Sequence, residues 1–214
     1  MALHVEILSS AYLLGNPTIE PLNTATLVPN MLMRRRLTRS AKIAIELLSK
    51  LTLTTPHRMV FGSAFGELGA SAAILDALKD RHSPSPTDFQ NSVYNTAASY
   101  VSILEGNHHE IMTLSCGDTT SQAVLKMGAI KAMDGDALVL VCLEAINIPN
   151  IDQVNRCIDT LEGGVALLVR HTTKEANLTL QPSTTKGVSA SLSHMLHIAQ
   201  HAPTLSTPVL KVDL

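Results

Sequence analysis

The feature that most constrains the fold is a pair of apolar runs without polar alternation. Residues 137–143 read ALVLVCL and residues 164–170 read GVALLVR. A strand with one solvated face alternates apolar and polar side chains, whereas a continuous apolar run is typical of a strand buried on both faces. The chain is therefore expected to build a sheet that helices cover on both sides.

Strand and helix patterns alternate along the sequence, which favours a mostly parallel α/β sheet. The element boundaries follow from apolar periodicity and from the Gly and Pro residues that interrupt it. Expected strands are residues 5–8, 58–61, 109–114, 137–143, 164–170 and 178–180, and expected helices are residues 31–51, 67–79, 93–104, 118–133 and 188–201. Residues 81–92, with two prolines, are expected to form a loop.

The helix expected over residues 118–133 is apolar almost all round. Its polar stripe is limited to Gln122, Lys126 and Lys131. A helix of this kind is buried rather than lying on a surface. We expect it between two layers of the fold or between two subunits.

Composition excludes several classes of function. The net charge of −2 gives no field for a nucleic acid or an anionic membrane, and the longest apolar run is too short to span a bilayer. The N-terminus MALHVEIL has no basic region, which argues against a signal peptide. Three cysteines without framework spacing favour a reducing cytoplasm. No cofactor is expected, since the glycines at 62, 66 and 69 match neither nucleotide-binding pattern.

One long segment carries a family resemblance. It runs from Ser85-Pro86 through Asn95 and Gly106, then through an apolar strand and a cysteine-containing turn, to Gly135-Asp136-Ala137. This order resembles the N-terminal half of β-ketoacyl synthases, which have a thiolase-type fold. The basic run at residues 34–36 and EGGVALLVR at residues 162–170 also fit that family. The resemblance implies one ketosynthase-like domain over residues 1–214, with the tail after about residue 171 unmatched.

Spacing within this resemblance decides which residue occupies the place of the nucleophile. Counting forward from Asn95 and back from Gly135 gives the same position, Asp118, and places Cys116 two residues too early. An Asp there is a favoured helix cap and a poor acyl acceptor. We therefore expect no catalytic residue, and interpret Cys116 as a buried, unreactive thiol.

A ketosynthase relative without its cysteine resembles a chain-length factor, which pairs with an active β-ketoacyl synthase and shapes the acyl tunnel. SVYNTAASY at residues 92–100 looks like the short type associated with aryl polyene and related polyketide or fatty-acid-type pathways. The resemblance implies a full-length ketosynthase partner, with acyl carrier protein reached through the complex. It places Asp88 and Phe89 at the tunnel gate, with core packing as the alternative for Phe89. It assigns the partner interface to the strand His109, Glu110, Ile111, Met112, Thr113, Leu114 and Ser115.

Other interpretations remain open at this stage. An active condensing enzyme or acyltransferase would use Cys116, and a homodimeric protein would bind an acyl chain or acyl carrier protein by itself. His194, His197 and His201 share one helical face, but a polar helix face explains them better than a metal site, and we expect no metal. In a complete ketosynthase, a second half packs against this N-terminal half. We expect the corresponding face here to be covered either by the partner or by the tail, through the helix expected at residues 188–201.

Overall fold

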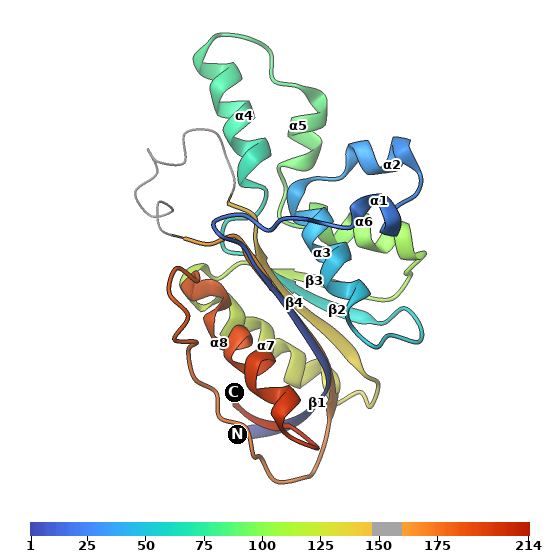
Figure 1. The fold of residues 1–214 in the computed structure, drawn as a ribbon, viewed down its shortest axis with the longest axis vertical. Helices are drawn as coiled ribbons and strands as arrows, with labels where there is room; N and C mark the ends of the chain where they lie inside the picture. The colour runs from blue at the N-terminus through green and yellow to red at the C-terminus, as the bar shows by residue number, and fades with distance from the viewer. Residues whose placement is uncertain (147–159) are drawn as a thin grey trace.

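A six-stranded mixed sheet organises the protein, whose computed structural model describes residues 1–146 and 160–214 (Figure 1). The order is β3-β2-β4-β5-β1-β6. β2 pairs in parallel with β3 and β4, while β5 is antiparallel to β4 and β1, and β6 is antiparallel to β1. Strands β1 to β4 thus share one direction, which confirms the expected α/β fold with most strands parallel. The strands are β1 Ala2–Leu14, β2 Arg58–Gly62, β3 Ile111–Leu114, β4 Leu138–Glu144, β5 Gly163–His171 and β6 Val209–Asp213.

The helices follow the expected order with three differences, the first being a short helix at Thr24–Leu27 where none was expected. They are α1 Thr24–Leu27, α2 Met31–Arg36, α3 Arg39–Ser49, α4 Leu68–Lys79, α5 Pro86–Asn91, α6 Thr96–Glu105, α7 Thr120–Ala132 and α8 Ala190–His201. The helix expected over residues 31–51 is divided, because Leu37 and Thr38 are extended and the Thr38 hydroxyl caps α3 by accepting from the Ala41 N–H. The loop expected at residues 81–92 contains α5, which Ser85 caps and Pro86 begins.

Each face of the sheet has its own hydrophobic cluster. On one face, α7 and α8 pack together against β4 and β5, and on the other α3 packs against the same strands and α6 packs against α3. The side chains of β4 are buried along its whole length, as are those of β5 from Gly163 to Val169. The apolar runs of the sequence are therefore the two central strands, in contact with helices on both sides.

Helix α7 packs on the sheet beside α8 in one layer, so the expectation that it lies between two layers does not hold for the described chain. Val124, Leu125 and Ala129 are almost fully buried in the cluster that also contains Met195 and Leu196 of α8. The face of α7 away from α8 is not covered within the described chain, and its Ile130 side chain is 43% exposed.

The tail places α8 on the same face of the sheet as α7. α8 lies beside α7 in Figure 1 and shares its hydrophobic cluster. The tail also adds β6 to the edge of β1, a strand that was not predicted, although Lys211 and Asp213 are exposed between buried neighbours. The strand expected at residues 178–180 is wrong, because only Leu178 makes a single bridge, to Leu210.

Candidate functional site: the turn after β3, the edge of β3 and the helical arm

The turn after β3 is built from hydroxyls and backbone groups. The Cys116 N–H donates to Thr120 Oγ1 (3.1 Å), and the Thr119 hydroxyl donates to the Cys116 carbonyl (2.9 Å). Gly117 has a φ of 56°, a conformation that favours glycine. These bonds fold residues 117–119 into one 3₁₀ turn directly before α7.

Two expectations about this turn are corrected. Cys116 is exposed and not buried, because β3 ends at the edge of the sheet and no described element covers the turn. Asp118 lies within the 3₁₀ turn, whereas Thr119 occupies the cap position of α7.

Glu144, a buried carboxylate at the carboxyl end of β4, links three parts of the structure. Glu144 accepts from the Ser63 hydroxyl (2.8 Å), the Ala64 N–H (2.6 Å) and the Phe65 N–H (3.1 Å), all in the turn after β2. It also accepts from the Ser191 hydroxyl of α8 (2.6 Å). Burial raises the pKa of Glu144, and these hydrogen bonds partly offset that rise. Sequence reasoning missed this residue, which joins β4, the turn after β2 and the tail.

Strand β3 forms an edge that is open within the described residues. It pairs with β2 on one side and lies at the end of the sheet order. Ile103 of α6, beside this edge, is 63% exposed. A groove of about 300 Å³ between α6 and β3 is lined by Ile103, His109 and Ile111 among others.

The predicted interface strand lies on this edge. Ile111, Met112, Thr113 and Leu114 are half-buried, while His109, Glu110 and Ser115 are exposed. The Glu110 carboxylate accepts from the Lys131 ammonium at 2.7 Å, which gives the edge a polar rim. Unpaired strand edges flanked by apolar side chains are surfaces that proteins normally cover.

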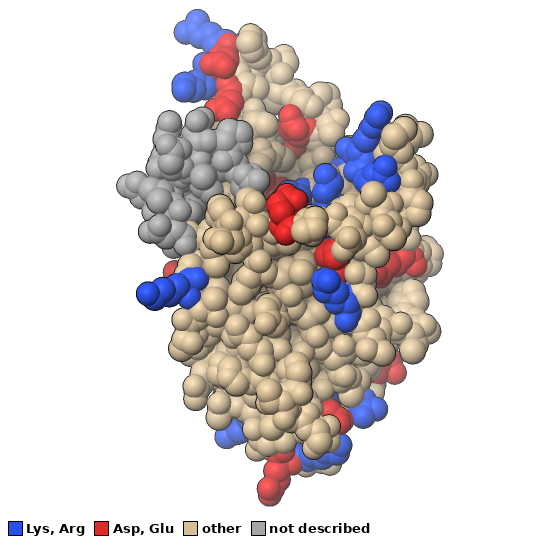
Figure 2. Space-filling model, in the orientation of Figure 1, with Lys and Arg blue, Asp and Glu red and all other residues tan. Residues whose placement is uncertain are grey.

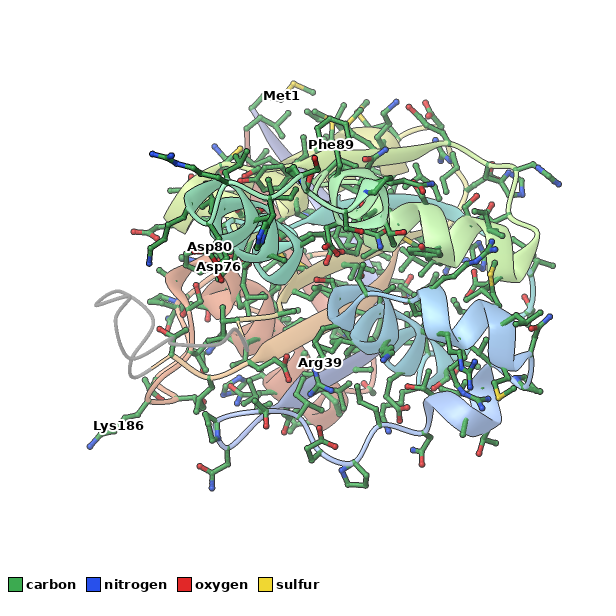
Figure 3. All side chains as sticks on the ribbon, turned by 90° about the horizontal axis from the view of Figure 1, so that it is seen from above. Met1, Arg39, Asp76, Asp80, Phe89 and Lys186 are labelled. Carbon is green, nitrogen blue, oxygen red and sulfur yellow. The ribbon has the colours of Figure 1, made fainter. Side chains whose placement is uncertain are left out.

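Helices α4 and α5 form an arm that extends from the rest of the chain (Figure 1). No residue of α4 is buried, and Leu75 and Leu78 are 66% and 57% exposed. Phe89 of α5 is 72% exposed and lies at the rim of the molecule in Figure 3. Core packing of Phe89 is therefore wrong. Asp88 is half-buried in the first turn of α5, beside Phe89.

The three histidines of α8 do not converge. The ring nitrogen Nε2 of His194 lies 3.1 Å from the Gln122 amide nitrogen of α7. The rings of His197 and His201 instead stack on each other, with centroids 4.1 Å apart. Burial lowers the pKa values of His194 and His197. Within residues 1–146 and 160–214, no group of three or more potential ligands could hold a metal ion.

No helix among the described residues has the length and hydrophobicity needed to cross a membrane. Cys157, the third cysteine of the sequence, lies outside the described residues.

Comparison with known families identifies the fold. The model of the β-ketoacyl synthase N-terminal domain matches residues 15–209. The chain belongs to this family. The match extends well past residue 171, so the family pattern includes the tail that sequence reasoning left unmatched.

Solved structures of ketosynthase complexes have the same fold as this family member. A ketosynthase (ApeO) in complex with its chain length factor (ApeC) from Xenorhabdus doucetiae matches with a TM-score of 0.63 and 20% identity. That match covers 83% of this chain and 85% of the other, so the two chains are similar in length. No curated protein matches the sequence.

Two further structures match the fold over part of their length. The ishigamide ketosynthase/chain length factor matches with a TM-score of 0.60 and 14% identity, over 77% of this chain and 51% of that one. A type II polyketide synthase acyl-carrier protein in complex with its ketosynthase bound to the hexaketide (AntDE:AntF) matches with a TM-score of 0.63 and 13% identity, over 80% and 63%. This chain thus spans about half to two thirds of those chains.

Proposed function

We propose that this chain is a non-catalytic chain-length-factor subunit that pairs with a full-length, active β-ketoacyl synthase. The open edge of β3 carries the proposal. Its unpaired edge and the exposed Ile103 of α6 beside it form a surface suited to a second protein. Similarity to chain-length-factor complexes supports a ketosynthase as that protein.

In this proposal, the chain makes no covalent bond to the acyl group. Asp118 stands where the spacing of the family predicts a nucleophile, and a carboxylate is a poor acyl acceptor. The chain contributes shape instead, by limiting the space into which the product of the partner can grow. Acyl carrier protein would reach the chain through the assembled complex.

The arm provides the means of limiting product length. Phe89 is the largest side chain on α5 and projects from it without a partner in the described chain. An aromatic ring that projects in this way can fill the end of a tunnel in another subunit, and its own subunit loses no packing. We assign Phe89 and its neighbour Asp88 to the gate on this basis.

The setting of the complex is part of the same proposal. We place it in the cytoplasm, in a polyketide or fatty-acid-type pathway of the aryl polyene kind. The cysteines and the resemblance of residues 92–100 to the short subgroup support this placement.

Co-purification tests the proposal. A tagged copy isolated from its native cells should retain a full-length ketosynthase with an intact cysteine at a one-to-one ratio. Reconstituted with that partner, the complex should form product, and this chain should acquire no acyl group detectable by intact-mass measurement. A chain that purifies as a homodimer, with no ketosynthase, would contradict the pairing.

A second candidate function is an active condensing enzyme or acyltransferase that uses Cys116. The exposure of Cys116 in the turn between β3 and α7 favours it. It predicts that a thiol-specific reagent modifies Cys116 and abolishes activity, and that an acyl group accumulates on that sulfur.

A further inference from the structure

A second cleft lies at the carboxyl end of the sheet, away from the edge of β3. Its volume is about 410 Å³, and its walls come from the α2–α3 junction, the start of α4, α5 and Ala145 after β4. Strand β3, which follows β2 in the sequence, lies on one side of β2 in the sheet, and β4, the next strand, lies on the other side. Open α/β sheets bind ligands at the carboxyl ends of strands where the strand order changes direction in this way.

Two guanidinium groups on one wall are free to bind a ligand. Arg35 and Arg36 line the cleft, and neither forms a hydrogen bond or ion pair with the described part of the chain. Figure 2 shows basic side chains gathered over α2. Arg39 differs from them, because its guanidinium binds Glu162 through two hydrogen bonds, at 2.9 and 2.6 Å. The positive charges of Arg35 and Arg36 are thus available to a ligand, whereas the charge of Arg39 is already neutralised by Glu162.

The opposite wall contains a buried acid. Glu67 is only 6% exposed, and its carboxyl group accepts a hydrogen bond from the Thr38 hydroxyl at 2.8 Å. Burial raises the pKa of Glu67 to about 7, against the smaller opposing effect of the hydroxyls of Thr38 and Ser40. Near neutral pH the group is about half protonated, so it can donate a hydrogen bond as well as accept one.

The cleft also has room beside Glu67. Gly69, in the first turn of α4, lines it, and no atom lies within 4 Å of the place where a Cβ at Gly69 would be. A side chain at this position would enter open space without a clash with the fold.

We propose that this cleft binds the oxyanion group, a carboxylate or a phosphate, of a small ligand between Arg35 and Arg36 on one wall and Glu67 on the other. Asp88, from α5, is the acidic side chain on the remaining wall and opposes the anion. The proposal does not depend on the pairing with a ketosynthase.

Equilibrium dialysis with labelled sulfate, at constant ionic strength and with the protein in the form in which it purifies, tests the site. The wild-type protein should bind one sulfate per chain. The double variant Arg35→Ala/Arg36→Ala should bind at least about tenfold more weakly, because charge-assisted hydrogen bonds are lost. Gly69→Leu should block binding without a change of charge, and Asp88→Asn should strengthen it. Lys186→Ala, which removes a positive charge that projects elsewhere (Figure 3), should have no effect.

The pH dependence identifies the role of Glu67. The charged groups that line the cleft with it are Arg35, Arg36 and Arg39 from the α2–α3 side and Asp88 from α5. An anion is bound best when Glu67 is protonated, and sulfate keeps its charge in the neutral range. Affinity should therefore fall about tenfold from about pH 6 to about pH 8, as Glu67 loses its proton. Glu67→Gln, which resembles the protonated form, should bind sulfate with little dependence on pH.

Competition distinguishes the two sources of oxyanion. Stronger displacement of sulfate by methyl phosphate than by acetate would indicate a phosphate-bearing ligand. Stronger displacement by acetate would indicate a ligand with a carboxylate. No saturable sulfate binding, or equal weakening by Lys186→Ala and the arginine variant, would overturn the proposal. The outcome is separate from that of the co-purification, because neither result requires the other.

Discussion

The two sides of helix α7 differ in how their apolar surface is covered. On the tail side, Met195, Leu196 and Ile198 of α8 are fully buried against it. On the exposed side, Ile130 of α7 and Met133 just after it remain about half exposed. The chain therefore completes one side with its own residues and leaves the other without a covering element among those described. This chain spans about half of some related chains. Its fold can be stable on the side of α7 that α8 covers and still require a partner on the exposed side.

Hydrogen bonding shows the same contrast. On the closed side, Glu144 joins β4 to Ser191 of α8 inside the protein. At the edge of β3, the partly exposed pair of Glu110 and Lys131 forms the rim. Buried polar links fix a structure strongly, whereas exposed ion pairs contribute little to stability.

The largest expected effect comes from opening the closed side. Leu196→Ala should lower the free energy of unfolding by about 2–5 kcal/mol, because the lost side chain leaves a cavity between α8 and the sheet. Leu75→Ala, at a leucine of α4 that is 66% exposed, is the matched control and should change it by less than about 0.5 kcal/mol. Chemical denaturation measures both. Similar losses in the two variants would mean that α8 does not stabilise the fold.

Changing the open side should affect assembly and spare the fold. Ile130→Asp places a charge on the exposed side of α7, so the ketosynthase should bind at least about tenfold more weakly, while the unfolding free energy changes by about 1 kcal/mol or less. Leu32→Asp, at an exposed leucine of α2, is the control and should retain binding. Analytical ultracentrifugation of the mixed subunits gives the affinity. Normal binding by Ile130→Asp would remove this surface from the interface.

A smaller change is expected at the arm. Phe89→Ala removes a ring that is 72% exposed, so the complex should assemble normally but release longer products. Leu78→Ala, on α4 of the same arm, should leave the product distribution unchanged. Mass spectrometry of products from the reconstituted complex tests the difference. An unaltered distribution for Phe89→Ala would exclude that side chain from the gate.

The smallest effect is expected at the turn after β3. Cys116→Ala should preserve both stability and product formation, because the thiol is exposed and the turn is held by Thr119 and Thr120 instead. Product assays of the complex with this variant decide between the two candidate functions. Complete loss of activity would favour Cys116 as a nucleophile.

Local patterns in the sequence were sufficient for the layered architecture. The apolar runs of β4 and β5 and the nearly all-apolar helix α7 indicated burial directly, because side-chain periodicity reflects which faces avoid water. Residues 188–201 were correctly predicted as a helix, of which the structure forms Ala190–His201, and the family resemblance correctly indicated the ketosynthase fold. The cap and first residue of α5, Ser85-Pro86, were also available as a helix signal, although the segment was interpreted as a loop.

Only the tertiary structure decided which surfaces are covered. Whether a cysteine after a strand is buried depends on what packs over it, and at Cys116 no described element does. The exposure of Phe89 depends on where the arm projects, and the buried position of Glu67 depends on the approach of Thr38, 29 residues earlier. Burial and pKa arise from contacts between segments far apart in the chain, and a single sequence contains no record of those contacts. The sequence by itself therefore determined the layers of this protein, and the tertiary structure determined its open edge, its arm and its cleft.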